Sequence, residues 1–383
     1  MAKLGELYKI TSGGTPSRTH SEYYEDGTIP WVKTGDLKDK YLFETDEKIS
    51  QLGLENSSAR IYLKNTVLLA MYGATIGATS ILKIDAATNQ ACAAFSPRED
   101  TLPEYLCAFL ESQKDKFIKD AVGGAQPNLS AGYLKTIEFK LPSLEQQTRI
   151  TRNLSKIDEL LLLRKQQIAK LDELVKARFV EMFGSYPENE NAYPVVNVSD
   201  IADAGVGVVI KPAQYYVTEE RGIKAFRSLN IGEMYIKDSD WVYFSTEGNE
   251  SNKKSQLHEN DLLIVRSGAP GTSCVVTKEF EGCNAVDVII AHPDLSKVNP
   301  WYLCAYINYP HGKKQIEEGT GGAAQQHFNV GKCNNLKVLL PPLEPQNQFA
   351  AFVERVNQQK QTVQQSLEKL ELLKKALMQE YFG

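Results

Sequence analysis

Short glycine-containing segments carry the side chains that could do chemistry in this 383-residue sequence. They cover residues 12–18, 72–77 and 123–128, and segments 266–271 and 321–327 repeat the last two patterns later in the chain. Glycine lets the backbone approach another molecule closely, and neighbouring Arg, Gln and Asn side chains can form paired hydrogen bonds to base edges. The alternative is that each segment is only a tight turn. Their recurrence favours a shared binding role.

Further polar residues stand beside these loops. Lys33 and Arg227 occupy matching positions after predicted strands, where a cation could meet a phosphate or a guanine, although a solvated surface charge fits as well. Asn89, Gln90 and Asn284 could make amide contacts or simply shape turns. The candidate DNA-contacting residues are Thr15, Ser17, Arg18, Lys33, Thr34, Tyr72, Ala74, Thr75, Asn89, Gln90, Gln126, Asn128, Arg227, Ser228, Asn230, Arg266, Ser267, Asn284, Gln325, Gln326 and His327.

Sequence patterns for the common catalytic sites are missing. Gly73 and Gly77 are not followed by the lysine of a nucleotide-binding P-loop, and the glycines at 205 and 207 lack the third glycine of a dinucleotide fingerprint. There is no Asn/Asp-Pro-Pro-aromatic methyltransferase motif. The six cysteines form no C-x-x-C pair, and the five histidines show no metal-ligand spacing. We therefore expect no catalytic residue, no metal site and no cofactor in this chain.

An internal repeat organises the sequence. Residues 141–184 align with 340–383 without a gap at an offset of 199, and 14 of these 44 pairs are identical. Towards the N-terminus the offset shrinks in small steps, while local patterns such as residues 65–73 and 260–268 still match. Such self-similarity is typical of duplicated architectures. Each half is a segment of short predicted strands, with short helices expected at 103–120 and 300–317, followed by a helical segment.

The helical segment of each repeat begins after a proline-containing stretch, which cannot continue a preceding element. About 38 residues without glycine or proline would span roughly 55 Å, more than a small domain needs, which favours pairing of the two helices over packing on their own domains. Apolar residues follow a coiled-coil spacing, interrupted at Arg164, Lys360 and Lys374. They are Ile150, Leu154, Ile157, Leu161, Ile168, Leu171 and Val175, then Phe349, Val353, Val356, Val363, Leu367, Leu370 and Leu377.

These patterns predict an α+β fold, with two repeated mixed α/β domains separated by two long antiparallel helices in a coiled coil. A pseudo-twofold axis relating the repeats would make the helices antiparallel and would place a domain at each end. The predicted boundaries are 1–143 for the first mixed domain, 144–184 for helical spacer 1, 185–342 for the second mixed domain and 343–383 for helical spacer 2. A spacer of this length would set two DNA half-sites about one helical turn apart.

Composition limits the setting in which the protein works. Hydrophobic residues make up 42% of the chain and charged residues 24%, which is typical of a globular protein. No segment approaches the ~18 consecutive apolar residues of a membrane span, and the first residues lack a signal-peptide pattern, so a cytoplasmic protein is expected. The net charge of −5 argues against wholesale phosphate binding unless positive charge is local or a partner supplies it.

Several motifs together carry a family resemblance. They are the duplicated Leu-Pro-x-Leu-Glu helix starts, the segment Gly-Gly-Ala-Gln-Pro-Asn-Leu-Ser at 123–130, the Thr-Pro-Ser loop at 15–17, and the helix endings at 176–179 and 375–378. In this order and duplication, the whole chain resembles the specificity subunits of type I restriction-modification systems. The resemblance implies a non-catalytic subunit of a DNA adenine methyltransferase and type I restriction endonuclease complex. Its two mixed domains, 1–143 and 185–342, would be target-recognition domains 1 and 2, each reading about half of a bipartite, asymmetric site in the major groove.

The resemblance also implies partners. These are double-stranded DNA, two modification subunits that carry S-adenosylmethionine and methylate adenine, and two restriction subunits driven by ATP and Mg²⁺. The modification subunits would dock on the helices and adjoining domain faces. Residues 324–329 depart from the corresponding loop at 126–130, so contacts there are less defined. The alternatives are an interaction scaffold that dimerises through its coiled coil without DNA specificity, and an enzyme with an unrecognised site.

Overall fold

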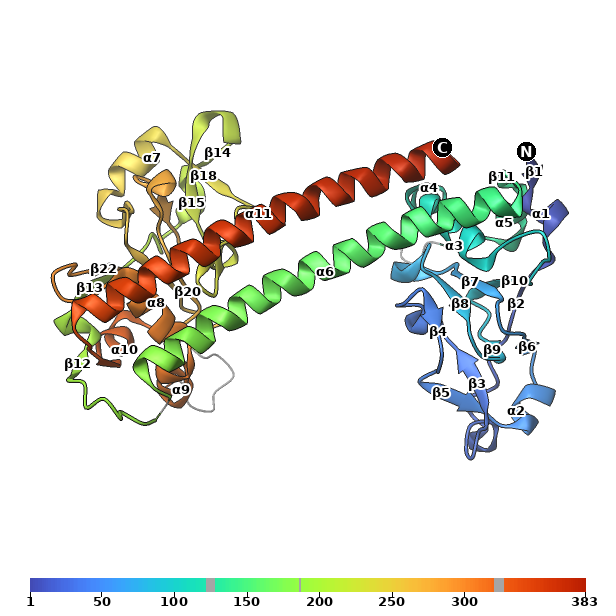
Figure 1. The fold of residues 1–383 in the computed structure, drawn as a ribbon, viewed down its shortest axis with the longest axis horizontal. Helices are drawn as coiled ribbons and strands as arrows, with labels where there is room; N and C mark the ends of the chain where they lie inside the picture. The colour runs from blue at the N-terminus through green and yellow to red at the C-terminus, as the bar shows by residue number, and fades with distance from the viewer. Residues whose placement is uncertain (122–127, 186, 320–326) are drawn as a thin grey trace. The chain divides into compact units, whose positions relative to one another are not determined.

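The computed structural model describes residues 1–121, 128–185, 187–319 and 327–383. The chain divides into two compact units: Met1–Arg164 together with Ser366–Gly383, and Lys165–Gln365. Figure 1 labels their helices and strands. The predicted contacts Gln126, Gln325 and Gln326 lie outside the described residues.

The first unit contains two mixed β-sheets. One has the strand order β2-β10-β7-β8-β4 and the other β5-β3-β9-β6, and a short pair, β1-β11, lies beside them. The strands are β1 (Ala2–Lys3), β2 (Ile10–Ser12), β3 (Ile29–Val32), β4 (Tyr41–Leu42), β5 (Glu47–Ile49), β6 (Ile61–Tyr62), β7 (Val67–Ala70), β8 (Thr79–Leu82), β9 (Ala86–Thr88), β10 (Cys92–Phe95) and β11 (Glu138–Phe139).

Short helices complete this unit: α1 (Leu4–Leu7), α2 (Gln51–Glu55), α3 (Pro103–Ser112), α4 (Lys114–Asp120) and α5 (Ala131–Thr136). The helix expected at 103–120 is thus two helices that meet at Gln113. Helix α3 contributes buried side chains to the same core as strands β7 and β10, with Leu106, Leu69 and Phe95 among them.

The second unit repeats this plan. Its sheet β13-β22-β19-β20 corresponds to β2-β10-β7-β8, and β14-β18-β15-β21 keeps a parallel pair, β15 with β21, where the first unit has β3 with β9. The strands are β12 (Val195–Asn197), β13 (Ala202–Val206), β14 (Tyr216–Val217), β15 (Gly222–Phe226), β16 (Ile231–Gly232), β17 (Tyr235–Ile236), β18 (Val242–Ser245), β19 (Leu262–Val265), β20 (Ser273–Val275), β21 (Asn284–Ala285), β22 (Val288–Pro293) and β23 (Lys337–Leu339).

The short helices of the second unit are α7 (Thr246–Ser251), α8 (Pro300–Asn308), α9 (Pro310–Gly319) and α10 (Val330–Asn334). The helix expected at 300–317 is broken before Pro310, whose ring cannot be accommodated inside a continuous helix.

Two 40-residue helices, α6 (Leu144–Phe183) and α11 (Leu343–Phe382), end the two repeats. In its first turns, each has a buried glutamine that joins it to the residue before a short helix, α3 or α8. Gln147 Oε1 accepts a hydrogen bond from the Leu102 amide at 2.8 Å, and the matching Gln346 accepts one from the Asn299 amide at 2.8 Å. The two matching glutamines therefore have the same structural role in both repeats.

The helices pair antiparallel within each unit. In the first unit, Lys374 Nζ lies 2.6 Å from Asp158 Oδ1, and Arg164 Nε donates to Ser366 Oγ at 3.2 Å. In the second unit, Lys360 Nζ lies 2.5 Å from Asp172 Oδ1. Each of the three charged residues that interrupt the predicted apolar seam therefore has a polar partner on the facing helix. The antiparallel prediction is confirmed.

The end of each long helix packs on the core of the other repeat. The Phe382 ring lies 5.4 Å from that of Tyr105, between ring centroids, and the Phe183 ring lies 4.7 Å from that of Tyr302. Phe183 and Phe382 are matched by the 199-residue offset, so the two contacts are equivalent. Within the described part of the chain, no helix combines the length and apolar character that crossing a membrane requires.

Candidate nucleic-acid interface

Two parallel strands of the first unit end side by side and place predicted contact residues together. Strands β3 and β9 pair in register, with Val32 opposite Thr88. The next residues, Lys33 and Asn89, therefore leave the sheet at the same edge, and the Asn89 amide donates to the Val32 carbonyl at 2.9 Å. Thr34, half-exposed, follows Lys33 in a short 3₁₀ turn.

Glu47 holds the two cations of this edge. Its carboxylate lies 2.5 Å from Lys33 Nζ and 2.6 Å from the Arg18 guanidinium, which also stacks over the Tyr24 ring at 4.1 Å. The hydrogen bond from Lys33, followed by that from Arg18, lowers the pKa of Glu47, and the same bond raises the pKa of Lys33. Glu47 and Lys33 are therefore both charged near neutral pH, and together with the guanidinium of Arg18 the three groups carry one net positive charge.

The loop at 12–18 packs against the end of strand β9. The Gly14 amide donates to the Thr88 carbonyl at 2.9 Å, and Thr15 Oγ1 donates to Gln90 Oε1 at 2.5 Å. A Cβ atom on Gly13 would lie only 1.9 Å from the Thr88 carbonyl oxygen, so only glycine fits there. Ser17, Arg18 and Gln90 are exposed at this edge.

The second glycine loop of the first unit adjoins the same edge. Tyr72, 42% exposed, forms a β-bridge with Asn128 and precedes the 3₁₀ turn Gly73–Thr75, which contains the exposed Ala74. The Met71 amide donates to the Ala91 carbonyl at 2.8 Å, and Asn89 Oδ1 accepts from the Ala91 amide at 3.1 Å. Hydrogen bonds thus connect the two groups of predicted residues.

Equivalent positions in the second unit carry different side chains. Arg227 follows β15 as Lys33 follows β3, and the Val286 amide donates to the Phe226 carbonyl at 2.7 Å, as Asn89 does to Val32. The Arg227 guanidinium donates to the Asp240 carbonyl, and exposed Ser228 begins the next 3₁₀ turn. One edge geometry therefore presents different chemistry in each repeat.

Arg266 is the centre of a polar cluster in the second unit. Its guanidinium lies 2.5 Å from Asp287 Oδ1 and 2.6 Å from His327 Nε2, and Ser267 Oγ lies 2.9 Å from His327 Nδ1. Ser267, Asp287 and His327 are exposed. This cluster can offer guanidinium, imidazole and hydroxyl groups to a ligand at one place.

Two predicted residues point inward. Asn230 and Asn284 are fully buried. Asn230 Nδ2 donates to the Ser239 carbonyl at 2.7 Å, and Asn284 Oδ1 accepts from Ser255 Oγ at 2.7 Å. Their amides shape the fold, and this burial argues against base contact by either side chain.

No sequence pattern pointed to Glu47 or Asp287, the carboxylates that pair with the cations of these two clusters. Glu47 is 14 residues from Lys33, and Asp287 is 21 residues from Arg266. Both are ordinary surface acids by type. Only the pairing of distant strands brings each one to its cation.

Comparison with known proteins identifies the family. The family model described as "Type I restriction modification DNA specificity domain" matches residues 1–173 and again 185–372. The chain belongs to this family. The two matches cover both repeats, so the duplication read from the sequence is a duplication of the specificity domain.

Curated relatives are named as specificity subunits of type I restriction enzymes. The type I restriction enzyme MjaIX specificity subunit of Methanocaldococcus jannaschii is 24% identical over 387 residues, covering 94% of this chain and 88% of the relative. The EcoprrI specificity subunit of Escherichia coli is 21% identical over 372 residues, with 92% and 86% coverage. This chain therefore has the length and organisation of a type I specificity subunit.

Solved structures share the fold of this specificity subunit. The S subunit of a type I restriction-modification system from M. genitalium aligns with a TM-score of 0.57 at 14% identity, covering 100% of this chain and 95% of that one. A chain from a structure of type I restriction-modification complex assembly and conformational transition aligns with a TM-score of 0.64 at 18% identity, with 100% and 96% coverage. The predicted fold class is confirmed.

Proposed function

We propose that this chain is the DNA-reading subunit of a type I restriction-modification complex and recognises a bipartite, asymmetric site. The observation that carries the proposal is the match of the specificity-domain family to both repeats. The exposed edges around Lys33 and Arg266 supply one candidate reading surface in each repeat. Because their side chains differ, the two half-sites differ in sequence.

The chain itself is non-catalytic in this proposal. Two modification subunits, carrying S-adenosylmethionine, dock on α6, α11 and the adjoining domain faces, and restriction subunits with ATP and Mg²⁺ complete the complex in the cytoplasm. Phosphate contacts made by these partners offset the net charge of −5 on this chain. Domain boundaries at 143, 184 and 342 separate two recognition domains from the helices that set half-site spacing.

The decisive experiment is methylation-sensitive sequencing of DNA from cells that express this chain with its neighbouring methyltransferase subunit. The expected result is methylation of a split motif with a fixed unread gap. Methylation that is absent, or unchanged when this chain is omitted, would support the scaffold alternative instead. The matched control is the methyltransferase subunit expressed alone.

Substitutions in the two repeats are expected to affect different half-sites. Arg266→Gln removes a guanidinium that can bind guanine bidentately, so methylation of cognate sites should fall about 10- to 100-fold, with relaxed sequence choice in one half of the motif. Lys33→Gln should affect recognition of the other half of the motif. If Lys33 contacts a phosphate, affinity falls uniformly and the salt dependence weakens by about one counterion.

The two variants serve as controls for each other, with motif discovery by sequencing as the measurement. Changes in the same half-motif from both variants would contradict one reading surface per repeat. If neither variant changed the methylated motif or the methylation rate, Lys33 and Arg266 would not be part of the DNA interface.

A further inference from the structure

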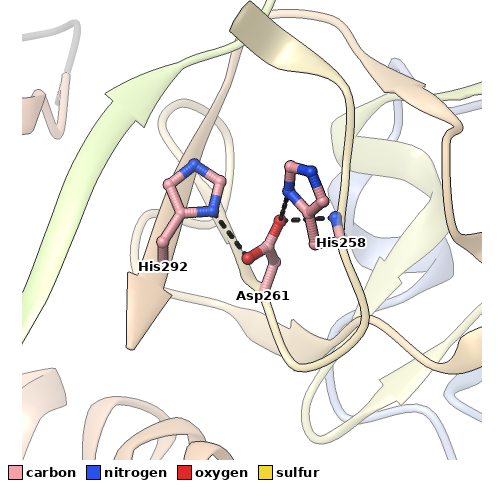
Figure 2. Close-up of side chains that lie close together, drawn as sticks. All are labelled: His258, Asp261 and His292. Carbon is pink, nitrogen blue, oxygen red and sulfur yellow. Dashed lines mark hydrogen bonds and ion pairs between the residues drawn. The ribbon is translucent and has the colours of Figure 1, made fainter. Parts of the chain in front are cut away.

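Three side chains of the second unit converge away from the candidate DNA-contacting residues. His292 Nδ1 lies 2.6 Å from Asp261 Oδ1, and His258 Nδ1 lies 3.7 Å from Asp261 Oδ2. Figure 2 shows the two imidazole rings on either side of the Asp261 carboxylate. One ligand atom from each residue lies within 4.8 Å of the other two.

The backbone sets this cluster up locally. Leu262 of β19 pairs with Ala291 of β22 in an antiparallel ladder. Asp261 precedes Leu262 and His292 follows Ala291, so these two residues face each other. A turn with Asn260 at φ +77° brings His258 back towards Asp261. The backbone amide of His258 donates a hydrogen bond to Asp261 Oδ2 at 2.7 Å. The carboxylate is thereby fixed before any ligand binds.

Burial and charge fit a cation. The Asp261 side chain is 5% exposed, whereas those of His292 and His258 are 37% and 65% exposed, so a solute can reach the group. Asp203 stands opposite His292 on the neighbouring strand β13 and adds a second carboxylate on that side. Two imidazoles and a carboxylate are the donors that zinc and similar divalent transition metals prefer.

The first repeat shows that the fold does not need these ligands. Val67 and Phe95 form the strand pair equivalent to Leu262 and Ala291, and Asn65, at φ +70°, matches Asn260. Thr66, Ser96 and Leu63 therefore occupy the positions of Asp261, His292 and His258. Only the second repeat therefore has side chains that can bind a metal ion at these three positions.

We propose that His258, Asp261 and His292 bind one divalent transition-metal ion, with water or Asp203 completing the coordination. The ion takes the place of the proton between His292 and Asp261 and joins the 258–261 turn to strand β22. It thereby stabilises one end of the β19–β22 strand pair. Arg266 and Asp287 lie at the other end of the same two strands. Bound metal is structural in this role and is independent of the proposed DNA reading.

The test uses the full-length chain without a histidine tag. Zn²⁺ binding is measured by equilibrium dialysis with elemental analysis, and Co²⁺ serves as the spectroscopic probe. We expect one ion per chain, a Co²⁺ spectrum typical of nitrogen and oxygen ligands, and no displacement by excess Mg²⁺, which prefers oxygen ligands. His258→Gln and His292→Gln should each weaken Zn²⁺ binding by at least about tenfold.

Two controls make the result decisive. His20→Gln removes an exposed histidine that is also paired with a carboxylate, Glu22 at 2.9 Å, and should leave Zn²⁺ binding unchanged. Metal-free thermal unfolding should be unchanged in His258→Gln, because that side chain is largely exposed. Zn²⁺ binding unaffected by His258→Gln and His292→Gln, or a Co²⁺ spectrum with thiolate bands from the buried cysteines, would overturn the proposal.

Discussion

Replacing Phe179 by alanine is expected to lower the free energy of unfolding by about 3–5 kcal/mol. Phe179, fully buried, lies on α6 where the helix packs on the second repeat. Its ring centroid is 5.7 Å from that of Tyr302, 5.4 Å from that of Tyr309 and 5.4 Å from that of Phe349. Alanine would leave a cavity among aromatic rings that are themselves fixed by other contacts, so little relaxation can offset the loss.

The measurement is urea unfolding of the full chain, followed by far-ultraviolet circular dichroism and tryptophan fluorescence, because two units can unfold in separate steps. Leu162→Ala is the control: Leu162 lies on the same helix but is 57% exposed, and its replacement should change stability by no more than about 0.5 kcal/mol. Equal losses from both substitutions would mean that Phe179 is not a core residue.

The long helices were predictable because their signals are local. Proline before Leu144 and before Leu343 marks the starts, and apolar residues at helical spacing mark the buried seam. The breaks in that seam could not be interpreted from one helix alone. Lys360 is accommodated because Asp172 faces it, and that pairing joins residues 188 positions apart.

The contact residues were also only partly predictable, because their surroundings again depend on residues that are distant in the sequence. Their positions at strand ends follow from short apolar runs bounded by glycine and polar residues. Which of them face solvent depends on tertiary packing, so the buried Asn230 looked the same as the exposed Gln90. The His258 cluster escaped a search by sequence spacing because His292 lies 31 residues beyond Asp261 and approaches it only through the β19–β22 ladder.

A fragment of residues 1–184 is expected to form a homodimer. In the full chain, residues 366–383, which include the end of α11, pack against the first repeat, with Tyr381 and Phe382 on its core. The fragment lacks this segment but carries the equivalent residues 167–184, including Phe183 in place of Phe382. Two copies can therefore exchange helix ends, so that Phe183 of each covers Tyr105 of the other. Because both recognition domains are then identical, such a dimer reads a palindromic site.

Light scattering coupled to size-exclusion chromatography measures the mass, and methylation sequencing with the modification subunit reports the motif. The matched variant is Phe183→Ala in the same fragment. Loss of a buried phenylalanine from each half of the symmetric interface should weaken association by at least about 100-fold. A fragment that stays monomeric at every concentration would contradict the exchange. In the proposed dimer, Phe183 of one copy takes the place of Phe382 against Tyr105 of the other. If Phe183→Ala left the dimer unaffected, this contact would contribute nothing, and association would have to use another surface.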